Sequence, residues 1–314
     1  MRDSTYYIGV DLGGTNLKSA LFDGEFKLIY ERRTAAFSDA GADMLLEQIA
    51  ENIEVLLAEA ELSTADVRCA GVGIPGLLNH REGVALFAAN FRDWKDVPVA
   101  KTLSERLSIP VFIDNDVRVN LYGEWFFGAG KGLQNVVLLT LGTGLGAGIV
   151  LDGRVLYGAT ASAGEIGHMN MYREGRPCNC GSSGCFGRYV SARGLVQTFR
   201  EKRPCAADEI TAEMLAEAFD KSDPAAIEAF RETGEILGFG LANIINLYNP
   251  EMVIIGGGMA NAGERLLAPT RESAEAHALK VPFAACSIVT AALGDSAGMF
   301  GAAAYAKLRL DEKF

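Results

Sequence analysis

Residues 6–22 read YYIGVDLGGTNLKSALF, and this stretch decides the fold. The apolar run YYIGVDL predicts a strand that ends at the glycine pair Gly13–Gly14. Apolar residues resume directly in NLKSALF, so the pattern predicts a second strand after the turn and not a helix. A similar sequence, NVVLLTLGTGLGAGIVL, begins at Asn135. Two such openings, at residues 6–30 and 135–157, predict an internal duplication with two α/β lobes that face a cleft.

The segments around these openings continue the alternation of strands and helices. Asp23–Gly24 and Asp152–Gly153 predict tight turns between further strands. We expect strands at 67–75, 110–116, 252–257 and 286–291, and helices at 43–62, 100–108, 119–130, within 211–247, about 262–278 and at 296–310. No linker rich in Pro or Ser separates the two halves, which predicts lobes that pack closely and move as a hinge.

The composition is that of a globular protein with a substantial core: 314 residues, of which 49% are hydrophobic and 22% charged. The net charge of −11 argues against nucleic acid as a partner, because a phosphate backbone needs a basic surface. No apolar stretch approaches the roughly 20 residues of a membrane-spanning helix, and the first residues lack the basic and apolar regions of a signal peptide. We therefore expect no membrane partner and a cytoplasmic protein.

Three glycine-rich turns follow predicted strands. They are Gly13-Gly14-Thr15, Gly142-Thr143-Gly144 and Gly256-Gly257-Gly258. Closely spaced glycines let backbone N–H groups approach an anion, and a threonine adds a hydroxyl donor. No Walker sequence occurs, and the first two turns precede a strand, unlike a G-x-G-x-x-G dinucleotide turn. One such turn alone is more typical of a tight hairpin, but three of them, two in equivalent places, favour phosphate binding by both lobes.

A cluster of soft metal ligands lies in HMNMYREGRPCNCGSSGC, residues 168–185. His168, Cys178, Cys180 and Cys185 form a Cys₃His set that suits tetrahedral Zn²⁺. Because four protein ligands close the coordination shell, we expect a structural zinc with no open position for chemistry. A reduced cysteine cluster without metal and a catalytic zinc are the alternatives.

With these motifs in this order, the chain resembles the ROK family (repressor, open reading frame, kinase) of the actin/hexokinase-like superfamily. The resemblance runs nearly from end to end and rests on IGVDLGGT, GIPG, DND, LGTGLG, GEIGH and CNCGSSGC. It implies two ribonuclease-H-like, actin-like ATPase lobes around a central cleft, with a small structural zinc loop. ATP and Mg²⁺ would bind in the cleft, and the usual reaction is phosphorylation of a hexose hydroxyl.

The resemblance also suggests how the chain is divided. We expect an N-terminal α/β lobe at residues 1–118, joined by the C-terminal helix at about 298–314. The C-terminal α/β lobe then spans residues 119–297 and carries the zinc-binding loop 168–185. Members of the family are commonly dimers or tetramers, so a homodimer or homotetramer is expected.

Phosphoryl transfer to a sugar hydroxyl needs a base, a metal-bridged triphosphate and an in-line approach. By resemblance Asp116, at the end of the strand VFIDND, is the general base that accepts the proton of the attacking hydroxyl. Alternatively Asp116 caps the next helix, and Asp114 is the second candidate for the base. Asp11 resembles the carboxylate that orients Mg²⁺ through water, although it could instead cap the first turn. Lys18, on the next strand, could face phosphate or solvent.

Sugar contacts are implied for Asp116 and for several further residues. Asn115 would exchange hydrogen bonds with sugar hydroxyls, and Asn90 either faces the sugar or caps its own loop. Glu165 and His168 stand three apart in GEIGH and would share one face of a turn or helix. The resemblance gives Glu165 a hydrogen bond to the sugar, and gives His168 a double role as zinc ligand and sugar neighbour.

One position departs from the family pattern. Members usually carry a glutamate two residues after the last cysteine, where it binds hydroxyls near the anomeric end of the sugar. Here Gly187 stands at that position, followed by Arg188. Loss of a buried acceptor would weaken recognition of that end by about 1–3 kcal/mol. Either the pocket accepts another substituent there, or Arg188 reaches into it and changes the preference.

The function that this combination predicts is ATP-dependent phosphorylation of a hexose, with glucose to glucose 6-phosphate as the first choice. The alternative substrates are N-acetylmannosamine, N-acetylglucosamine, allose, mannose and fructose. A catalytically weak sugar-binding sensor is a second class, which the loss of the glutamate keeps open. A sugar-responsive repressor is a third, but repressors of the family carry a helix-turn-helix segment before the DLGGT turn, and only residues 1–10 precede that turn here.

Overall fold

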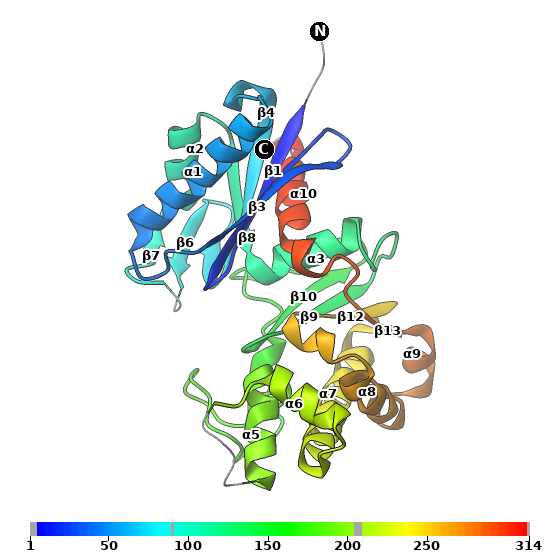
Figure 1. Cartoon of the computed structure of the whole chain (residues 1–314). Coiled ribbons are helices and arrows are strands. Elements are labelled where there is room, and N and C mark those ends of the chain that lie inside the picture. Colours follow the sequence, from blue (N-terminus) through cyan, green and yellow to red (C-terminus); the bar gives the residue numbers. More distant parts are fainter. Residues whose placement is uncertain (1–4, 89–90, 204–208, 313–314) are drawn as a thin grey trace. The chain divides into compact units, whose positions relative to one another are not determined.

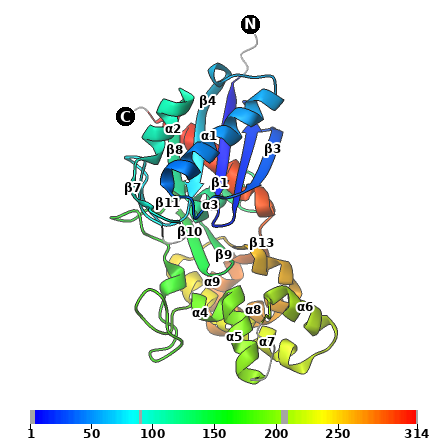
Figure 2. The ribbon, with the colours of Figure 1, turned by 60° about the vertical axis from the view of Figure 1, so that its left-hand side comes forward.

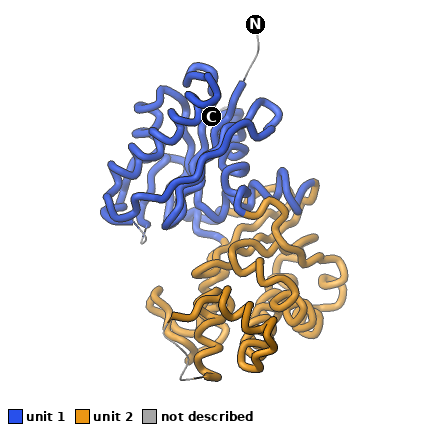
Figure 3. Tube along the Cα trace, viewed as in Figure 1, with its two compact units in different colours: residues 1–131, 157–163, 295–314 blue, residues 132–156, 164–294 orange. Residues whose placement is uncertain are grey.

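The computed structural model of the chain describes residues 5–88, 91–203 and 209–312. The chain forms two compact units. Unit 1 consists of residues 1–131, 157–163 and 295–314, and unit 2 of residues 132–156 and 164–294 (Figure 3). Each unit has its own five-stranded sheet and its own hydrophobic core.

The sheet of unit 1 combines antiparallel and parallel strands. Its order is β3-β2-β1-β4-β8; β2 pairs antiparallel with both β1 and β3, whereas β1, β4 and β8 run parallel. The strands are β1 (Tyr6–Leu12), β2 (Asn16–Phe22), β3 (Leu28–Ala35), β4 (Val67–Ile74) and β8 (Val111–Asn115). The predicted strand–glycine turn–strand opening is confirmed as the β1–β2 hairpin.

Helices cover both faces of this sheet (Figure 1, Figure 2). On one face lie α1 (Ala42–Glu59) and α2 (Val99–Leu107), whose apolar side chains share a core with alternate residues of the strands. On the other face lie α3 (Asp116–Phe126) and α10 (Ala297–Asp311), which pack closely against each other. Helices were expected at all four places, and helical spacing of apolar residues indicated the one at 43–62. The helix expected at 119–130 begins three residues earlier, at Asp116, and ends at Phe126.

Glycines in two strands allow the close approach of α10. A Cβ atom on Gly9 would lie 1.8 Å from the carbonyl oxygen of Met299, and one on Gly71 would lie 1.8 Å from that of Ala302. These contacts are backbone to backbone, so a methyl group could fit only if the helix moved away from the sheet. The glycines in YYIGVDL and VRCAGVGIP therefore set the distance between α10 and the strands that end at the candidate site.

A small antiparallel sheet, formed by the part of the chain that follows β4 and precedes α2, was not expected from the sequence. It consists of β5 (Leu77–Asn79), β6 (Val84–Phe87) and β7 (Lys95–Val97). Each strand is only three or four residues long, and Leu77 and Phe87 are exposed. Such short segments carry too few residues for an alternating pattern to stand out. A 3₁₀ turn, η1 (Thr64–Asp66), precedes β4.

The sheet of unit 2 repeats the strand order and directions of unit 1. Its order is β11-β10-β9-β12-β13, with β10 antiparallel to β9 and β11, and with β9, β12 and β13 parallel. The strands are β9 (Val136–Leu141), β10 (Leu145–Leu151), β11 (Arg154–Val155), β12 (Met252–Gly256) and β13 (Ser287–Thr290). The predicted duplication is thus present in the topology of the two sheets.

Helices also form most of the core of unit 2. The long helix α7 (Pro224–Tyr248) starts at the cap Asp223, followed by Pro224 in the first turn, and packs along α8 (Glu264–His277). The remaining elements are α4 (Gly187–Val190), α5 (Ala192–Lys202), α6 (Ala212–Asp220), α9 (Lys280–Ala285) and the 3₁₀ turns η2 (Ile166–His168), η3 (Gly258–Ala262) and, in both units, η4 (Gly294–Ser296). Among the described residues, none of the helices has the length and apolar character needed to cross a membrane.

Candidate functional site

The carboxyl ends of three parallel strands bring acidic residues of unit 1 to one edge of its sheet. Asp11 on β1 is level with Gly73 on β4, and Gly73 is level with Asp114 on β8. Asn115 and Asp116 follow directly. Ligands of open α/β sheets bind at this edge, beyond the carboxyl ends of the strands. The edge that the fold predicts for a site therefore carries the carboxylates that the sequence singled out.

The strand β8 ends one residue earlier than the sequence suggested. Asn115 is its last residue and also the N-cap of α3, because its Oδ1 accepts hydrogen bonds from the backbone N–H groups of Val117 at 3.0 Å and Arg118 at 3.4 Å. Asp116 is the first residue of α3, so it does not close the strand. The N-cap is therefore Asn115 and not Asp116, although Asp116 Oδ1 also accepts from the Val117 N–H at 3.0 Å. Asn115 Nδ2 donates to the carbonyl of Gly76 at 3.3 Å.

Asp114 is engaged in other interactions. Its side chain is fully buried; Oδ1 accepts hydrogen bonds from Arg118 Nε and from the backbone N–H of Asn115, both at 2.7 Å, and Oδ2 accepts one from the Tyr157 hydroxyl at 2.6 Å. A carboxylate held in this way has no free oxygen aimed at a substrate. These contacts argue against Asp114 as the general base.

The carboxyls of Asp116 and Asp11 both have raised pKa values. Burial raises the pKa of Asp116 to about 6, against the lowering effects of the Val117 N–H and the Arg118 charge. Burial and the charge of Asp116 raise the pKa of Asp11 to about 7. When two partly buried carboxylates repel each other, a cation bound near them stabilises their ionised forms. Asp11 therefore fits the role of an indirect Mg²⁺ ligand.

The first glycine turn is closed by a hydrogen bond of its own backbone. The N–H of Gly13 donates to the carbonyl of Asn16 at 2.8 Å, and Thr15 and Asn16 are exposed. Lys18, which could have faced phosphate, donates from Nζ to the Asp295 carbonyl oxygen at 3.2 Å. Lys18 thus has a partner within unit 1.

The other two glycine turns lie next to each other in unit 2. They follow β9 and β12, which are parallel neighbours with Gly256 level with Thr140. A Cβ atom added to Gly142, Gly144 or Gly258 would meet nothing within 4 Å. Packing of the described residues therefore does not require glycine at these three positions, whereas a phosphate group close to the backbone would.

The four soft ligands meet as the sequence predicted. The ligand atoms of His168, Cys178, Cys180 and Cys185 all lie within 4.8 Å of one another. Cys178 Sγ is 3.9 Å from His168 Nδ1, and Cys180 Sγ is 3.6 Å from Cys185 Sγ. In a tetrahedral zinc site with bonds of about 2.3 Å the sulfur atoms are about 3.8 Å apart, so the donor set and its spacing fit zinc. The backbone N–H of Ser182 and neighbouring Cys178 lower the pKa of Cys180, which favours its thiolate, whereas burial and neighbouring Cys180 raise the pKa of Cys185. The donor set and its spacing therefore carry the assignment to zinc.

The loop that carries this cluster is anchored by a buried arginine that no sequence motif marks. Arg176 is buried and donates to both carboxylate oxygens of Glu201, at 3.1 and 2.7 Å, and to the Thr198 hydroxyl at 2.9 Å. A bidentate pair of this kind fixes the loop on α5. An arginine in a polar loop carries no sequence signal that separates it from a solvated one.

Glu165 directly precedes the 3₁₀ turn η2, His168 ends it, and Glu165 Oε2 lies 3.9 Å from His168 Nε2. His168 also lines a cavity of about 180 Å³, together with Thr143, Gly144, Leu145, Gly167, Cys178, Asn179, Cys185, Gly187, Arg188, Ser191 and Arg193. The cavity thus joins the metal cluster, the second glycine turn and the position of the missing glutamate. Asn90, the remaining candidate for a sugar contact, lies outside the described residues.

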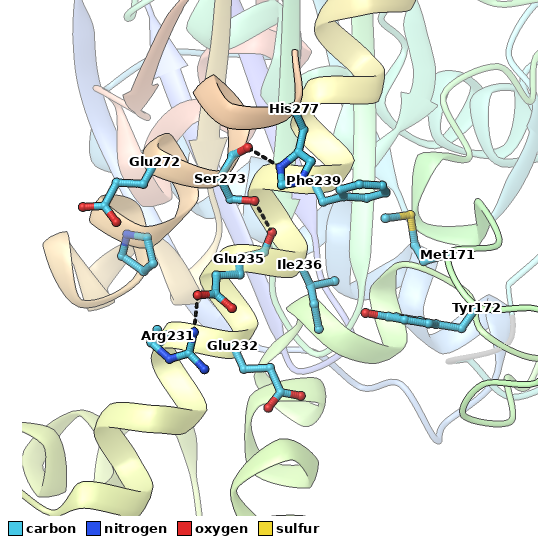
Figure 4. A pocket seen from close by; sticks show the side chains of 11 residues that line it. Met171, Tyr172, Arg231, Glu232, Glu235, Ile236, Phe239, Glu272, Ser273 and His277 are labelled. Atoms are coloured by element: carbon cyan, nitrogen blue, oxygen red, sulfur yellow. Dashed lines mark hydrogen bonds and ion pairs between the residues drawn. The ribbon is translucent and has the colours of Figure 1, made fainter.

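A larger cavity of about 750 Å³ lies elsewhere in unit 2, between α7, α8 and the loop at Met171 and Tyr172 (Figure 4). None of the predicted nucleotide, sugar or metal residues lines it. Several of its polar groups satisfy each other, since Ser273 Oγ donates to the Glu235 carbonyl at 2.7 Å and Arg231 pairs with the Glu235 carboxylate. We therefore do not assign this cavity to the reaction.

Comparison with known proteins identifies the family. The model of the ROK family matches residues 7–309. The chain belongs to the ROK family. A ROK glucokinase from Streptomyces griseus, solved with glucose and AMPPNP, has a TM-score of 0.80 and 32% identity, covering 96% of this chain and 99% of its own. The α/β sheets of both units fit the actin-like ATPase fold of such ROK structures.

Kinases and regulators both occur among the ROK relatives. A glucokinase of Halalkalibacterium halodurans is 35% identical over 308 residues, which are 94% of this chain and 93% of the relative. A xylose repressor of Caldicellulosiruptor bescii is 30% identical over 310 residues, which are 96% of this chain and 77% of the repressor. Activity has therefore to be argued from the site as well as from the family.

Proposed function

We propose that this protein transfers the γ-phosphoryl group of ATP to a hydroxyl of a hexose, with glucose as the first substrate to test. An ATP-dependent sugar kinase is what the glucokinase relatives and the ROK structure with glucose and AMPPNP support. The identity of the sugar is a separate part of the proposal. It depends on position 187, where Gly187 replaces the glutamate that members of the family usually carry.

One observation carries the chemistry: Asp116 stands at the carboxyl edge of the unit 1 sheet, beside the capping residue Asn115 and in electrostatic contact with Asp11. Its carboxylate would accept the proton of the attacking hydroxyl, so that the oxygen can attack the terminal phosphorus as the bond to ADP breaks. Asn115 would orient the same hydroxyl. Asp11 would hold Mg²⁺ through water, and the metal would neutralise charge on the transferred group.

The glycine turns supply the phosphate contacts in this proposal. The turns Gly13-Gly14-Thr15 in unit 1 and Gly142-Thr143-Gly144 in unit 2 would bind the triphosphate, and Gly256, Gly257 and Gly258 would lie near the nucleotide. The donors would be backbone N–H groups other than those of Gly13 and Gly142, which donate to the carbonyls of Asn16 and Gly144 at 2.8 and 3.0 Å. The open space above Gly142, Gly144 and Gly258 supports this assignment. Bound zinc would supply no chemistry; it would hold Glu165 and His168 in place for the sugar.

An ADP-release assay over a panel of hexoses and N-acetylhexosamines tests the proposal, with Asp116→Asn as the control. Phosphorylation of glucose or another member of the panel, lost in Asp116→Asn, is the expected result. A fully active Asp116→Asn variant would refute the assignment of the base. Light scattering on the same preparation measures the expected assembly into a homodimer or homotetramer.

The similarity to a repressor makes a sugar-responsive sensor the second candidate function. A sensor would bind a sugar of the panel without releasing ADP. Titration calorimetry with the same sugars separates this outcome from a kinase that was tested on the wrong substrate, which would neither bind the sugar nor turn it over.

A further inference from the structure

A buried hydrogen-bond network lies behind Asn115 and Asp116 in unit 1. Its centre is the carboxylate of Asp114, which is fully buried and accepts from Arg118 Nε at 2.7 Å and from the Tyr157 hydroxyl at 2.6 Å. The backbone N–H of Asn115 donates to the same carboxylate at 2.7 Å. Three donors from different directions fix the orientation of this side chain, and the low polarity of the interior strengthens each bond.

The network reaches the proposed base through the backbone. Asn115 follows Asp114 directly, and its Oδ1 accepts from the N–H groups of Val117 and Arg118, which sets the first turn of α3. Asp116 is the first residue of that turn. Movement of the Asp114 carboxylate would shift the Asn115 N–H and the Arg118 side chain, and with them both residues that the reaction uses.

Tyr157 enters the network from a distant part of the sequence. It begins the segment 157–163, and Arg118 Nη1 donates to the carbonyl of Ala161 in the same segment at 2.9 Å. The Arg118 guanidinium also lies 5.0 Å from the centre of the Tyr157 ring, and His80 stacks on that ring at 4.2 Å. Arg118 therefore binds both the segment and Asp114, and Tyr157 is held with its hydroxyl on the carboxylate.

We propose that Tyr157 and Arg118 are positioning residues for phosphoryl transfer, which act through Asp114 on the orientation of Asn115 and Asp116. The inference rests on the proposed function. Both residues act on the reaction through Asp114, so they differ from the base in role. Their contribution arises because a shift of a catalytic group by about 1 Å costs up to roughly a hundredfold in rate.

The chain offers a matched control in Tyr122. Its hydroxyl lies 3.2 Å from that of Tyr157, and both rings line the same cavity of about 640 Å³. Because the Tyr157 hydrogen is donated to Asp114, the Tyr122 hydroxyl donates to Tyr157. Tyr122→Phe thus removes a buried hydroxyl from the same place but leaves the bond to Asp114 intact.

We expect Tyr157→Phe to lower kcat about tenfold with the KM for ATP changed less than about twofold, and Tyr122→Phe to change both less than about twofold. Arg118→Lys keeps the charge but loses the forked donor, so it should lower kcat in the same way. If Tyr157→Phe melts below the assay temperature, the comparison of kcat between Arg118→Lys and Tyr122→Phe tests the positioning role instead. A KM effect without a kcat effect would indicate a merely structural role.

Two failures of this experiment are distinguishable. Unchanged kcat in Tyr157→Phe, or equal losses in the two tyrosine variants of an active enzyme, would overturn the positioning role alone. Wild-type protein that phosphorylates no sugar of the panel would overturn the proposed function, and the positioning role with it.

Discussion

The ionisation of Asp116 gives a sharp test of the proposed chemistry. Burial raises the pKa of this carboxyl to about 6. A general base has to be ionised to accept a proton, so activity is present above this pKa and is lost as the pH falls through it. One pH unit below the pKa only about a tenth of the carboxyl groups is ionised. We therefore expect kcat/KM for the sugar to fall about tenfold from about pH 7.5 to about pH 5.

The assay is ADP release at several pH values with ATP and Mg²⁺ in excess, and thermal melting at each pH shows that the protein is folded. Asp11 titrates in the same range, because burial and Asp116 raise its pKa to about 7. Mg²⁺ near Asp11 would lower the pKa of Asp11. The acid limb should therefore stay in place as the Mg²⁺ concentration is varied; a limb that moves with Mg²⁺ would belong to Asp11. A flat profile between about pH 5 and pH 7.5 would refute the assignment of Asp116 as the base.

Three further variants test the other parts of the site. Asp11→Asn should abolish activity yet raise the melting temperature at pH 8. The reason is that a carboxyl whose folded-state pKa is raised to about 7 lowers the stability of the folded protein as the pH rises through that value. An unchanged melting temperature would contradict the pKa shift. Cys180→Ser should lower the zinc content, measured by atomic absorption, from about one ion per chain. It should also raise the KM for the sugar more than the KM for ATP, because zinc would no longer hold His168 in place. Cys286→Ser, outside the cluster, is the control. Gly187→Glu should change the ratio of kcat/KM between glucose and 1-deoxyglucose by up to about tenfold, whereas Gly187→Ala should leave it unchanged. A Cβ at this position would lie 3.3 Å from the Leu145 backbone nitrogen, so a Cβ atom fits with a small adjustment.

The parts of the fold with strong local patterns could be predicted. The β1–β2 and β9–β10 hairpins could be predicted because short apolar runs on both sides of a glycine turn indicate two strands and not a strand and a helix. The Cys₃His cluster was readable because its ligands are close in the sequence, and the structure brings their atoms within 4.8 Å. In each case the residues that interact also stand near one another in the chain.

Contacts between distant segments could not be predicted. Nothing in the sequence pairs Asp114 with Tyr157, and a tyrosine after a predicted strand is compatible with many positions. The end of β8 was misplaced by one residue because Asn115 caps α3, and the letters DND allow any of the three residues to be the cap. That single residue matters, since it moves Asp116 from the strand to the first turn of the helix.

The duplicated topology suggests how the two units could serve different parts of the proposed reaction. Each unit ends three parallel strands at one edge of its sheet, in the same strand order. In unit 1 these ends carry Asp11 and Asn115, with Asp116 following in the first turn of α3, and these acidic and amide side chains suit proton transfer and metal binding. Unit 1 also has the glycine turn Gly13-Gly14-Thr15 after β1. In unit 2 the equivalent ends carry the glycines at 142–144 and 256–258, which expose backbone N–H groups suited to phosphate. Because the two sheets share one strand order, we infer that both units can offer a glycine turn to phosphate at equivalent places, and that the proposed proton transfer and metal binding depend on the carboxyl and amide side chains at the strand ends of unit 1.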